Sequence, residues 1–236
     1  MDRDLARRAS AEAAGTALLV AVVVGSGIAA QRLSPNDIGL ELLENALATG
    51  AGLVALILAF GSVSGAHFNP VVTLADRILG GTTTRDGAVY VVAQVVGACV
   101  GCMVANVMFD LDAVNVSTHA RSSGSLWMSE AVATFGLVVV ILGVVRTGRA
   151  ALAPFAVGAY ITAAYWFTSS TSFANPAVTI GRTLSNTFAG IAPRSMPMFV
   201  VMQVVGGLLA VVAARYWYAD VRADDIVMPH EATEAA

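Results

Sequence analysis

Charged residues are scarce in this sequence, and lysine is missing altogether. Only 12% of the 236 residues are charged, all 13 basic residues are arginine, and 57% of the residues are hydrophobic. A soluble domain usually carries about 25% charged residues, so the composition indicates a chain built for the lipid bilayer. The net charge of −3 excludes a nucleic-acid reader, because such proteins present a basic surface.

The sequence also lacks the residue clusters on which most enzymes depend. It has two cysteines and three histidines, and no nucleophile–base pair or cofactor motif. Cys99 and Cys102 form one Cys-x-x-Cys pair inside an apolar run, with no second pair or neighbouring histidine. Such a pair can be redox-active or bind a metal, but we interpret it as two small packing residues beside Gly97 and Gly101. We therefore expect no enzyme activity, no cofactor and no metal.

Long uncharged runs dominate the rest of the chain. About 20 apolar residues cross a bilayer as a helix, and three of the six runs are close to that length. The run 131–145 reaches it once Glu130 and the uncharged residues 122–129 are added. Two other runs, 45–75 and 150–181, are too long by about ten residues. The six runs are 13–31, 45–75, 87–109, 131–145, 150–181 and 195–214.

Three sequence features occur twice in the same order, which indicates an internal duplication. They pair Glu12 with Glu130, Asn69-Pro70 with Asn175-Pro176, and Gln94 with Gln203. Each unit, approximately 10–109 and 126–218, reads as helix, helix, short Asn-Pro segment, helix. Three crossings per unit is an odd number, so the second unit enters the membrane from the opposite face. This is the pattern of an inverted repeat, whose solute path lies between the two units.

The two Asn-Pro segments lie where the overlong runs have residues to spare. Asparagine is a preferred N-cap and proline a preferred first helical residue, so Asn69 and Asn175 each begin a short helix. We predict an all-α membrane protein with six transmembrane helices plus two re-entrant half-helices whose N-termini meet near the midplane. It forms one channel domain over residues 1–236, with 220–236 as a cytoplasmic tail.

Such a meeting point has a clear electrostatic consequence. Each helix N-terminus carries roughly half an elementary charge, so two of them repel cations and hydronium. Each asparagine caps its own helix through its carbonyl oxygen, which leaves its NH₂ donors for a passing solute. Dipole barriers of this kind select against ions in channels.

The distribution of arginine predicts the orientation of the chain. Cytoplasmic loops carry an excess of basic residues. With both termini in the cytoplasm, nine arginines lie inside and four outside. The inner set is Arg3, Arg7, Arg8, Arg77, Arg85, Arg146, Arg149, Arg215 and Arg222, and the outer set is Arg32, Arg121, Arg182 and Arg194.

Both Asn-Pro segments resemble the signature loops of the aquaporin, or major intrinsic protein, family. Residues 64–73, Ser-Gly-Ala-His-Phe-Asn-Pro-Val-Val-Thr, resemble the first loop, with valine in place of the usual final alanine of Asn-Pro-Ala. Residues 173–177, Phe-Ala-Asn-Pro-Ala, resemble the second loop. The resemblance extends over roughly residues 10–218. It implies a homotetramer with one pore per subunit, a multi-pass protein of the bacterial inner (plasma) membrane, with water and small neutral solutes as partners.

The same resemblance assigns roles to individual residues. Asn69 and Asn175 would be hydrogen-bond donors at the pore midplane, and His67 would line the cytoplasmic half of the pore. Glu12 and Glu130 would brace the re-entrant loops by accepting backbone N–H bonds, in keeping with the rule that carboxylates within a membrane need partners. The alternative for His67 is a buried histidine that only satisfies its own hydrogen bonds.

This sequence departs from the family at the outer constriction, the selectivity filter. Most members have arginine directly after the second Asn-Pro-Ala, and this chain has Val178. Spacing places Thr49 and Ser172 at two other filter positions. The fourth position is Tyr165 if counted from Pro154, or Ala163 if counted back from the second motif, and we favour Tyr165.

Arg182 follows Val178 by four residues and lies on the same helix face. It either moves the missing charge one turn outward or is a cation at the mouth that meets solvent or lipid head groups.

A filter of Thr, Tyr, Ser and Val is less charged than a water filter and wider on two sides. Family members with open filters pass glycerol, urea or neutral metalloid hydroxides, and bacterial members with a small residue at the arginine position resemble those associated with arsenic handling. We expect arsenite as the leading solute, followed by glycerol-type solutes. The alternatives are a strict water channel, if Tyr165 closes the ring, and a coupled secondary transporter, for which His67, Glu12 and Glu130 are the titratable groups in the membrane.

Overall fold

The computed structural model describes residues 2–218, and the expected tail at 220–236 lies outside this range. Six helices are long and apolar enough to cross a membrane, and no strand occurs among the described residues. The helices are α1 (Arg3–Leu33), α2 (Ile38–Ser64), α3 (Pro70–Leu79), α4 (Thr84–Met108), α5 (Gly124–Arg146), α6 (Ala153–Phe167), α7 (Pro176–Gly181) and α8 (Met196–Trp217), with short 3₁₀ turns η1 (Ala150–Leu152), η2 (Arg182–Leu184) and η3 (Pro193–Ser195). The predicted fold class is confirmed: α3 and α7 are the two short helices between the long ones.

Side-chain caps fix where most of the long helices begin. Asp2, Asp37, Thr83 and Ser123 precede α1, α2, α4 and α5, and each accepts a hydrogen bond from the backbone N–H three residues later. Such caps satisfy backbone donors that have no partner in the first turn. The start of α5 at Gly124 supplies the length that the run 131–145 lacks by itself.

Small residues bring the long helices into close contact. A side chain at Gly97 or Gly101 of α4 would collide with the backbone carbonyl of Ala13 or Ala17 on α1. Gly206 of α8 approaches the carbonyl of Ala131 on α5 in the same way. Small residues at helix interfaces are typical of membrane proteins, because they allow backbones to pack closely. Cys99 and Cys102 are free thiols on this same helix α4.

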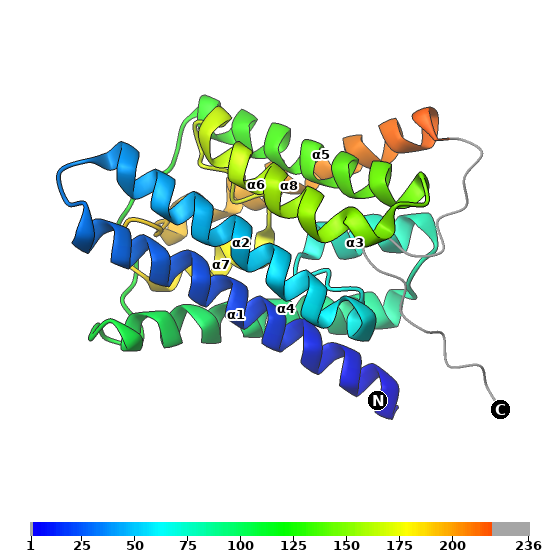
Figure 1. Ribbon diagram of the computed structural model, residues 1–236, viewed down its shortest axis with the longest axis horizontal. Helices are drawn as coiled ribbons and strands as arrows, with labels where there is room; N and C mark the ends of the chain where they lie inside the picture. Colours follow the sequence, from blue (N-terminus) through cyan, green and yellow to red (C-terminus); the bar gives the residue numbers. More distant parts are fainter. Residues whose placement is uncertain (1, 219–236) are drawn as a thin grey trace.

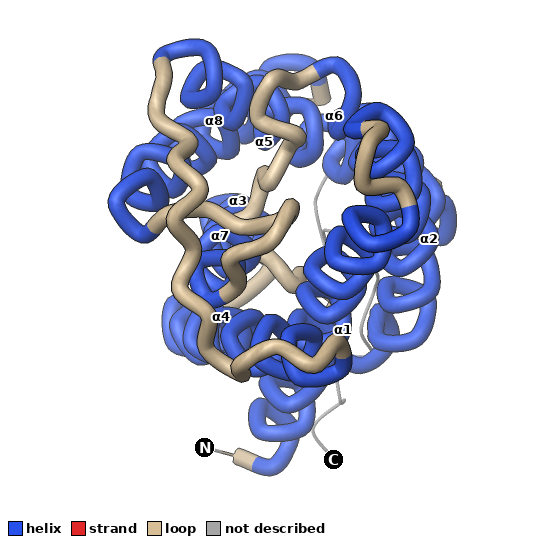
Figure 2. Tube along the Cα trace, turned by 90° about the vertical axis from the view of Figure 1, so that its left-hand side faces the viewer, coloured by secondary structure: helices blue, strands red, loops and turns tan. Residues whose placement is uncertain are grey.

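The long helices surround the two short ones. Seen along the long axis of the molecule, the helices form the periphery, while α3, α7 and the loops that lead to them occupy the middle (Figure 2). α1 packs on α2 and α4, α5 packs on α6 and α8, and α3 and α7 both contact α4 and α8. The arrangement therefore places both Asn-Pro segments in the interior of the bundle.

Candidate functional site

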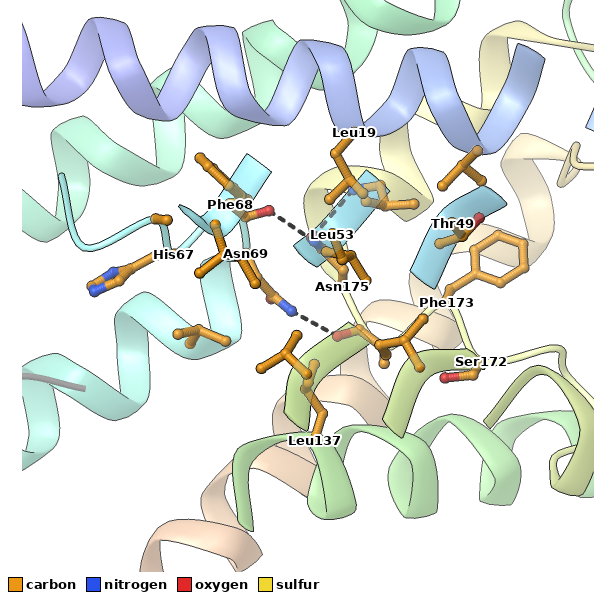
Figure 3. A pocket seen from close by; sticks show the side chains of 18 of the residues that line it. Leu19, Thr49, Leu53, His67, Phe68, Asn69, Leu137, Ser172, Phe173 and Asn175 are labelled. Carbon is orange, nitrogen blue, oxygen red and sulfur yellow. Dashed lines mark hydrogen bonds between the residues drawn. The ribbon is translucent and has the colours of Figure 1, made fainter. Parts of the chain in front are cut away.

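Asn69 and Asn175 cap the two half-helices, and each of them also forms a hydrogen bond with the loop of the opposite half. The side-chain oxygen of Asn69 accepts from the N–H of Val71, and that of Asn175 accepts from the N–H of Ala177. Asn69 Nδ2 donates to the carbonyl of Ala174 at 2.8 Å, and Asn175 Nδ2 donates to the carbonyl of Phe68 at 2.8 Å (Figure 3). One of the two N–H groups of each amide is thus already used, which leaves one donor and not two for a passing solute.

The backbone before each asparagine has an unusual conformation. Phe68 and Ala174 both have φ of 49°, and Ala66 and Ser172 have φ of 49° and 51°. The left-handed region is uncommon for residues other than glycine, and such conformations persist only where surrounding contacts hold them. Here they aim the carbonyls of Phe68 and Ala174 at the opposite asparagines.

Two buried glutamates hold these loops from behind. Glu12 accepts from the backbone N–H of His67 at 2.9 Å and of Phe68 at 2.7 Å. Glu130 accepts from the N–H of Phe173 at 3.0 Å and of Ala174 at 2.9 Å. These contacts are the ones that the expected bracing role requires.

Each glutamate accepts a further hydrogen bond from a glutamine, which also donates to a threonine. Gln94 Nε2 donates to Glu12 at 2.8 Å and to Thr73 Oγ1 at 3.0 Å. In the other half, Gln203 Nε2 donates to Glu130 at 2.6 Å and to Thr179 Oγ1 at 2.8 Å. The glutamines were visible in the sequence as a repeated pair, whereas their threonine partners were not singled out.

One cavity connects most of the expected site residues. Its lining is largely apolar and includes His67, both asparagines and all four filter residues, but not the two glutamates. His67 lies at one end and Ser172, Thr49 and Phe173 at the other, with Asn69 and Asn175 between them (Figure 3).

His67 combines both of the roles that the sequence left open. It lines the cavity, and its Nδ1 lies 3.1 Å from Thr73 Oγ1. Its Nε2 is 4.0 Å from a carboxylate oxygen of Asp76. The histidine is therefore a partnered group that also faces the cavity.

Thr49 and Ser172 lie at the opposite end of the cavity (Figure 3), and Tyr165 and Val178 line the same cavity. We refer to these four residues as the filter end. Thr49 Oγ1 and the hydroxyl of Tyr165 are 3.1 Å apart and share a hydrogen bond. Ser172 Oγ is buried without a partner among the described residues. Ala163 is exposed on α6, whereas Tyr165 lines the cavity, which is the arrangement that the favoured count requires.

Arg182 lines the same cavity and is only 2% exposed. The interpretation of Arg182 as a cation in contact with solvent or lipid head groups is therefore wrong. Its guanidinium carbon lies 3.4 Å from the centroid of the Phe173 ring, and its Nε donates to the carbonyl of Ala189. A second arginine, Arg121, lies against the same ring at 5.2 Å.

The loop residue His119 is influenced by the positive charges of Arg121 and Arg182 near the filter end. Burial, followed by the charges of Arg121 and Arg182, lowers the pKa of His119 below its usual value of 6.5. Nearby charges of like sign disfavour protonation, so this ring is neutral at pH 7. Sequence reasoning counted Arg121 only among the outer arginines and Phe173 only as part of the second signature loop. It gave neither a site role, because Arg121 lies far from the second Asn-Pro segment in the chain.

Known proteins resemble this chain over most of its length. The family model described as major intrinsic protein matches residues 2–174. Aquaglyceroporin AqpS of Rhizobium meliloti is 52% identical over 213 residues, which cover 90% of this chain and 91% of the relative. Aquaporin AqpM of Methanothermobacter marburgensis is 31% identical and covers 90% of this chain and 97% of its own length.

A solved structure shares the fold at much lower sequence similarity. The aquaglyceroporin from Plasmodium falciparum matches with a TM-score of 0.68 at 20% identity, over 92% of this chain and 96% of that protein. The family model ends one residue before Asn175, while both relatives span the second Asn-Pro segment as well.

Proposed function

The chain belongs to the major intrinsic protein family and is a membrane channel for small uncharged solutes, not an enzyme, and from this premise we propose that it passes neutral metalloid hydroxides such as arsenite, and glycerol-type solutes. The AqpS relative, an aquaglyceroporin by name, supports a solute larger than water. The proposed path is the cavity that runs from His67 past the asparagines to the filter end.

The composition of the filter end carries the proposal. Val178 occupies the position where most family members have arginine, and it faces the cavity with its short apolar side chain. Thr49, Tyr165 and Ser172 supply three hydroxyl groups on the same ring. A solute with several hydroxyl groups can exchange hydrogen bonds with them while its bulk passes the apolar valine.

The proposed barrier to protons and cations lies at the two asparagines. Each half-helix N-terminus contributes roughly half a positive charge, and the remaining N–H of each amide can donate to a passing oxygen. A water molecule held by such donors cannot accept a proton from the next water, which interrupts proton transfer. In this scheme Glu12 and Glu130 keep the loops in register, and the two repeat units, approximately 10–109 and 126–218, meet along the path.

A strict water channel is the second candidate, because of one contact. The hydrogen bond between Thr49 and Tyr165 narrows the ring in the described conformation. A coupled transporter receives less support, since Glu12 and Glu130 are fully buried and already accept bonds from backbone and glutamine donors.

Replacement of Val178 by arginine tests the proposal. A long charged side chain would fill the ring, so arsenite and glycerol should be slowed more than water. We expect their flux to fall about tenfold or more, which corresponds to about 1.4 kcal/mol of added barrier, with a smaller loss for water. All three fluxes should be measured by stopped flow in one proteoliposome preparation.

The variant Val178→Thr is the matched control, because threonine has nearly the same volume and should retain the flux of all three solutes. Equal loss of every solute in Val178→Arg would indicate misfolding. No loss would mean that Val178 does not lie at the constriction. A wild-type channel that passes water but neither larger solute would favour the second candidate.

We further propose a homotetramer in the bacterial inner (plasma) membrane, as is typical of the family. The bundle exposes large apolar side chains along its long helices, among them Leu18, Leu47, Leu58, Val96, Phe155 and Leu209. Lipid and neighbouring subunits would cover such surfaces. Light scattering of the purified protein, corrected for detergent, should give four chains per particle, and a monomer would contradict the proposal.

A further inference from the structure

Two arginines near the filter end make no salt bridge within the described residues, and the nearest acidic group that acts on both of them, Glu130, does so without direct contact. The ion pairs among residues 2–218 involve Asp4, Asp86 and Asp76, and none includes Arg121 or Arg182. Buried charges are normally paired, so two unpaired cations close to one another require an explanation.

Neutral groups hold both arginines in place. Arg121 donates from Nε to the carbonyl of Gly190 at 2.9 Å and from Nη2 to the carbonyl of Phe188 at 3.2 Å. Arg182 donates from Nε to the carbonyl of Ala189, which lies between these two residues. Carbonyl dipoles and the ring of Phe173 orient the guanidinium groups, but they do not neutralise them.

The terminal edge of Arg182 has no hydrogen-bond partner within the described residues, and the side chain that carries it lines the cavity. A guanidinium carries five N–H donors, and the bond to Ala189 is the only hydrogen bond that the Arg182 side chain makes within the described part of the chain. The side chain is almost fully buried and lines the cavity. Since buried donors are nearly always satisfied, this edge is available to a group that enters the cavity.

Two neighbours favour a ligand at this edge. Ser172 lines the same cavity, and its Oγ is buried without a partner among the described residues. It directly precedes Phe173, on which Arg182 lies. Val178, one helical turn before Arg182, offers no competing carboxylate. The cavity lining thus supplies the positive charge of Arg182 and no carboxylate, and Arg121 adds a second positive charge from behind the ring of Phe173.

We propose that the filter end binds a small, singly charged oxyanion on the free edge of Arg182, with Ser172 as a further donor and Arg121 as the source of additional positive potential. The planar guanidinium edge matches two oxygens of one anion, and fixed positive charge concentrates anions in a cleft. The location rests on the proposed solute path, whereas the ligand class does not depend on which neutral solute passes. A bound anion would block that path.

Nitrate is a suitable probe, because it is planar, permanently charged and small. Glycerol flux should be measured in proteoliposomes of the full chain, with nitrate replacing chloride at constant ionic strength on both sides of the membrane. We expect wild-type flux to fall along a saturation curve with half-inhibition between about 1 mM and about 100 mM, the range of weak binding in a water-filled site. Removal of nitrate should restore the flux.

Variants of Arg182 test whether this residue is responsible for the inhibition of glycerol flux by nitrate. Arg182→Gln should conduct glycerol and lose the response to nitrate, and Arg182→Lys should need about tenfold more nitrate, because lysine keeps the charge without the two-pronged edge. Arg194→Gln removes the same charge from an exposed position and should respond as wild type does. An equal response to nitrate in wild type and Arg182→Gln, or no response in a conducting wild-type channel, would overturn the proposal.

A second measurement separates this proposal from the proposed function. If wild-type protein passes no glycerol, the channel assignment fails, but anion binding can still be scored from thermal unfolding in detergent. Nitrate should raise the midpoint, relative to chloride, in wild type and Arg194→Gln by more than in Arg182→Gln, since a ligand stabilises the state that binds it. The same shift in all three proteins would reject the site.

Discussion

The side-chain amide of each of the two asparagines forms hydrogen bonds both with its own half-helix and with the opposite loop. The oxygen of Asn175 caps α7, one N–H binds the carbonyl of Phe68, and Asn69 makes the equivalent bonds in the other half. The side chain is therefore a structural link between the two loops as well as a donor to the cavity. A substitution at either position changes both functions together.

The substitution Asn175→Asp tests this combined role. A carboxylate can still cap α7, but it cannot donate to the carbonyl of Phe68 and would face that oxygen across a contact of 2.8 Å. Its negative charge would also offset the positive helix ends. We expect neutral-solute flux to fall about tenfold, or about 1.4 kcal/mol in barrier height, and cation leak to rise, as measured by flux and by dissipation of a potassium gradient.

Asn186→Asp makes the same chemical change at an exposed loop position. Its side-chain oxygen only accepts, from the N–H and hydroxyl of Thr118, so an aspartate can replace it and the flux should be unchanged. Unaltered flux and ion exclusion in Asn175→Asp would place that residue away from the path.

At the scale of elements, each of two pairs of long helices holds the loop that precedes one half-helix. Glu12 on α1 and Gln94 on α4 hold the loop before α3, and Glu130 on α5 and Gln203 on α8 hold the loop before α7. The close contacts of α1 with α4 and of α5 with α8 bring each glutamate and glutamine within hydrogen-bond reach. The packing of the long helices therefore fixes the positions of the two loops.

Glu130→Gln should weaken this support. The amide keeps one acceptor oxygen but turns an NH₂ group toward the backbone donors of the loop, so at least one buried donor loses its partner. We expect a loss of about 1–3 kcal/mol in the free energy of unfolding and a lower solute flux, measured by denaturant unfolding in detergent and by proteoliposome assays.

Glu12→Gln should have an effect of the same size, because its bonding is equivalent. Asp112→Asn, at an exposed loop position, is the control and should leave stability and flux unchanged. Wild-type stability in both glutamine variants would show that the loops do not depend on the carboxylates.

At the scale of the whole molecule, an even number of membrane-spanning helices places both ends of the described chain at the same end of the bundle. The start of α1 and the end of α8 lie at the same end of the bundle, with the turn between α5 and α6, while the long loop between α4 and α5 lies at the opposite end (Figure 1). Given the arginine distribution, we propose that the end with the termini faces the cytoplasm. Ser117 in the long loop is only 2% exposed, so a reporter of topology belongs at the exposed Ala120.

Single cysteines at Ala120 and at the exposed Thr147, in a background with Cys99 and Cys102 replaced by alanine, test the orientation. We expect a membrane-impermeant thiol reagent to label Ala120→Cys on intact cells, and Thr147→Cys only after the cells are permeabilised. Labelling of Thr147→Cys alone on intact cells would reverse the proposed topology.

The sequence by itself determined the features that depend on local physical chemistry. Apolar length predicts each membrane span, and asparagine followed by proline predicts where α3 and α7 begin, because transfer to lipid and helix capping act over a few neighbouring residues. The duplication extended these inferences to Glu12 and Glu130, since repeated residues in a repeated pattern indicate a shared structural environment.

Only the tertiary structure decided the contacts between segments that are distant in the chain. It placed Tyr165, and not Ala163, against the cavity. The sequence left both open, because the helix register and the loop length gave different counts. It also committed one N–H of each asparagine to the opposite loop and placed Arg182 on Phe173 beside Arg121. These outcomes depend on how α7 and the loops at 110–123 and 185–192 pack together, and such packing leaves no periodic signal in any one segment.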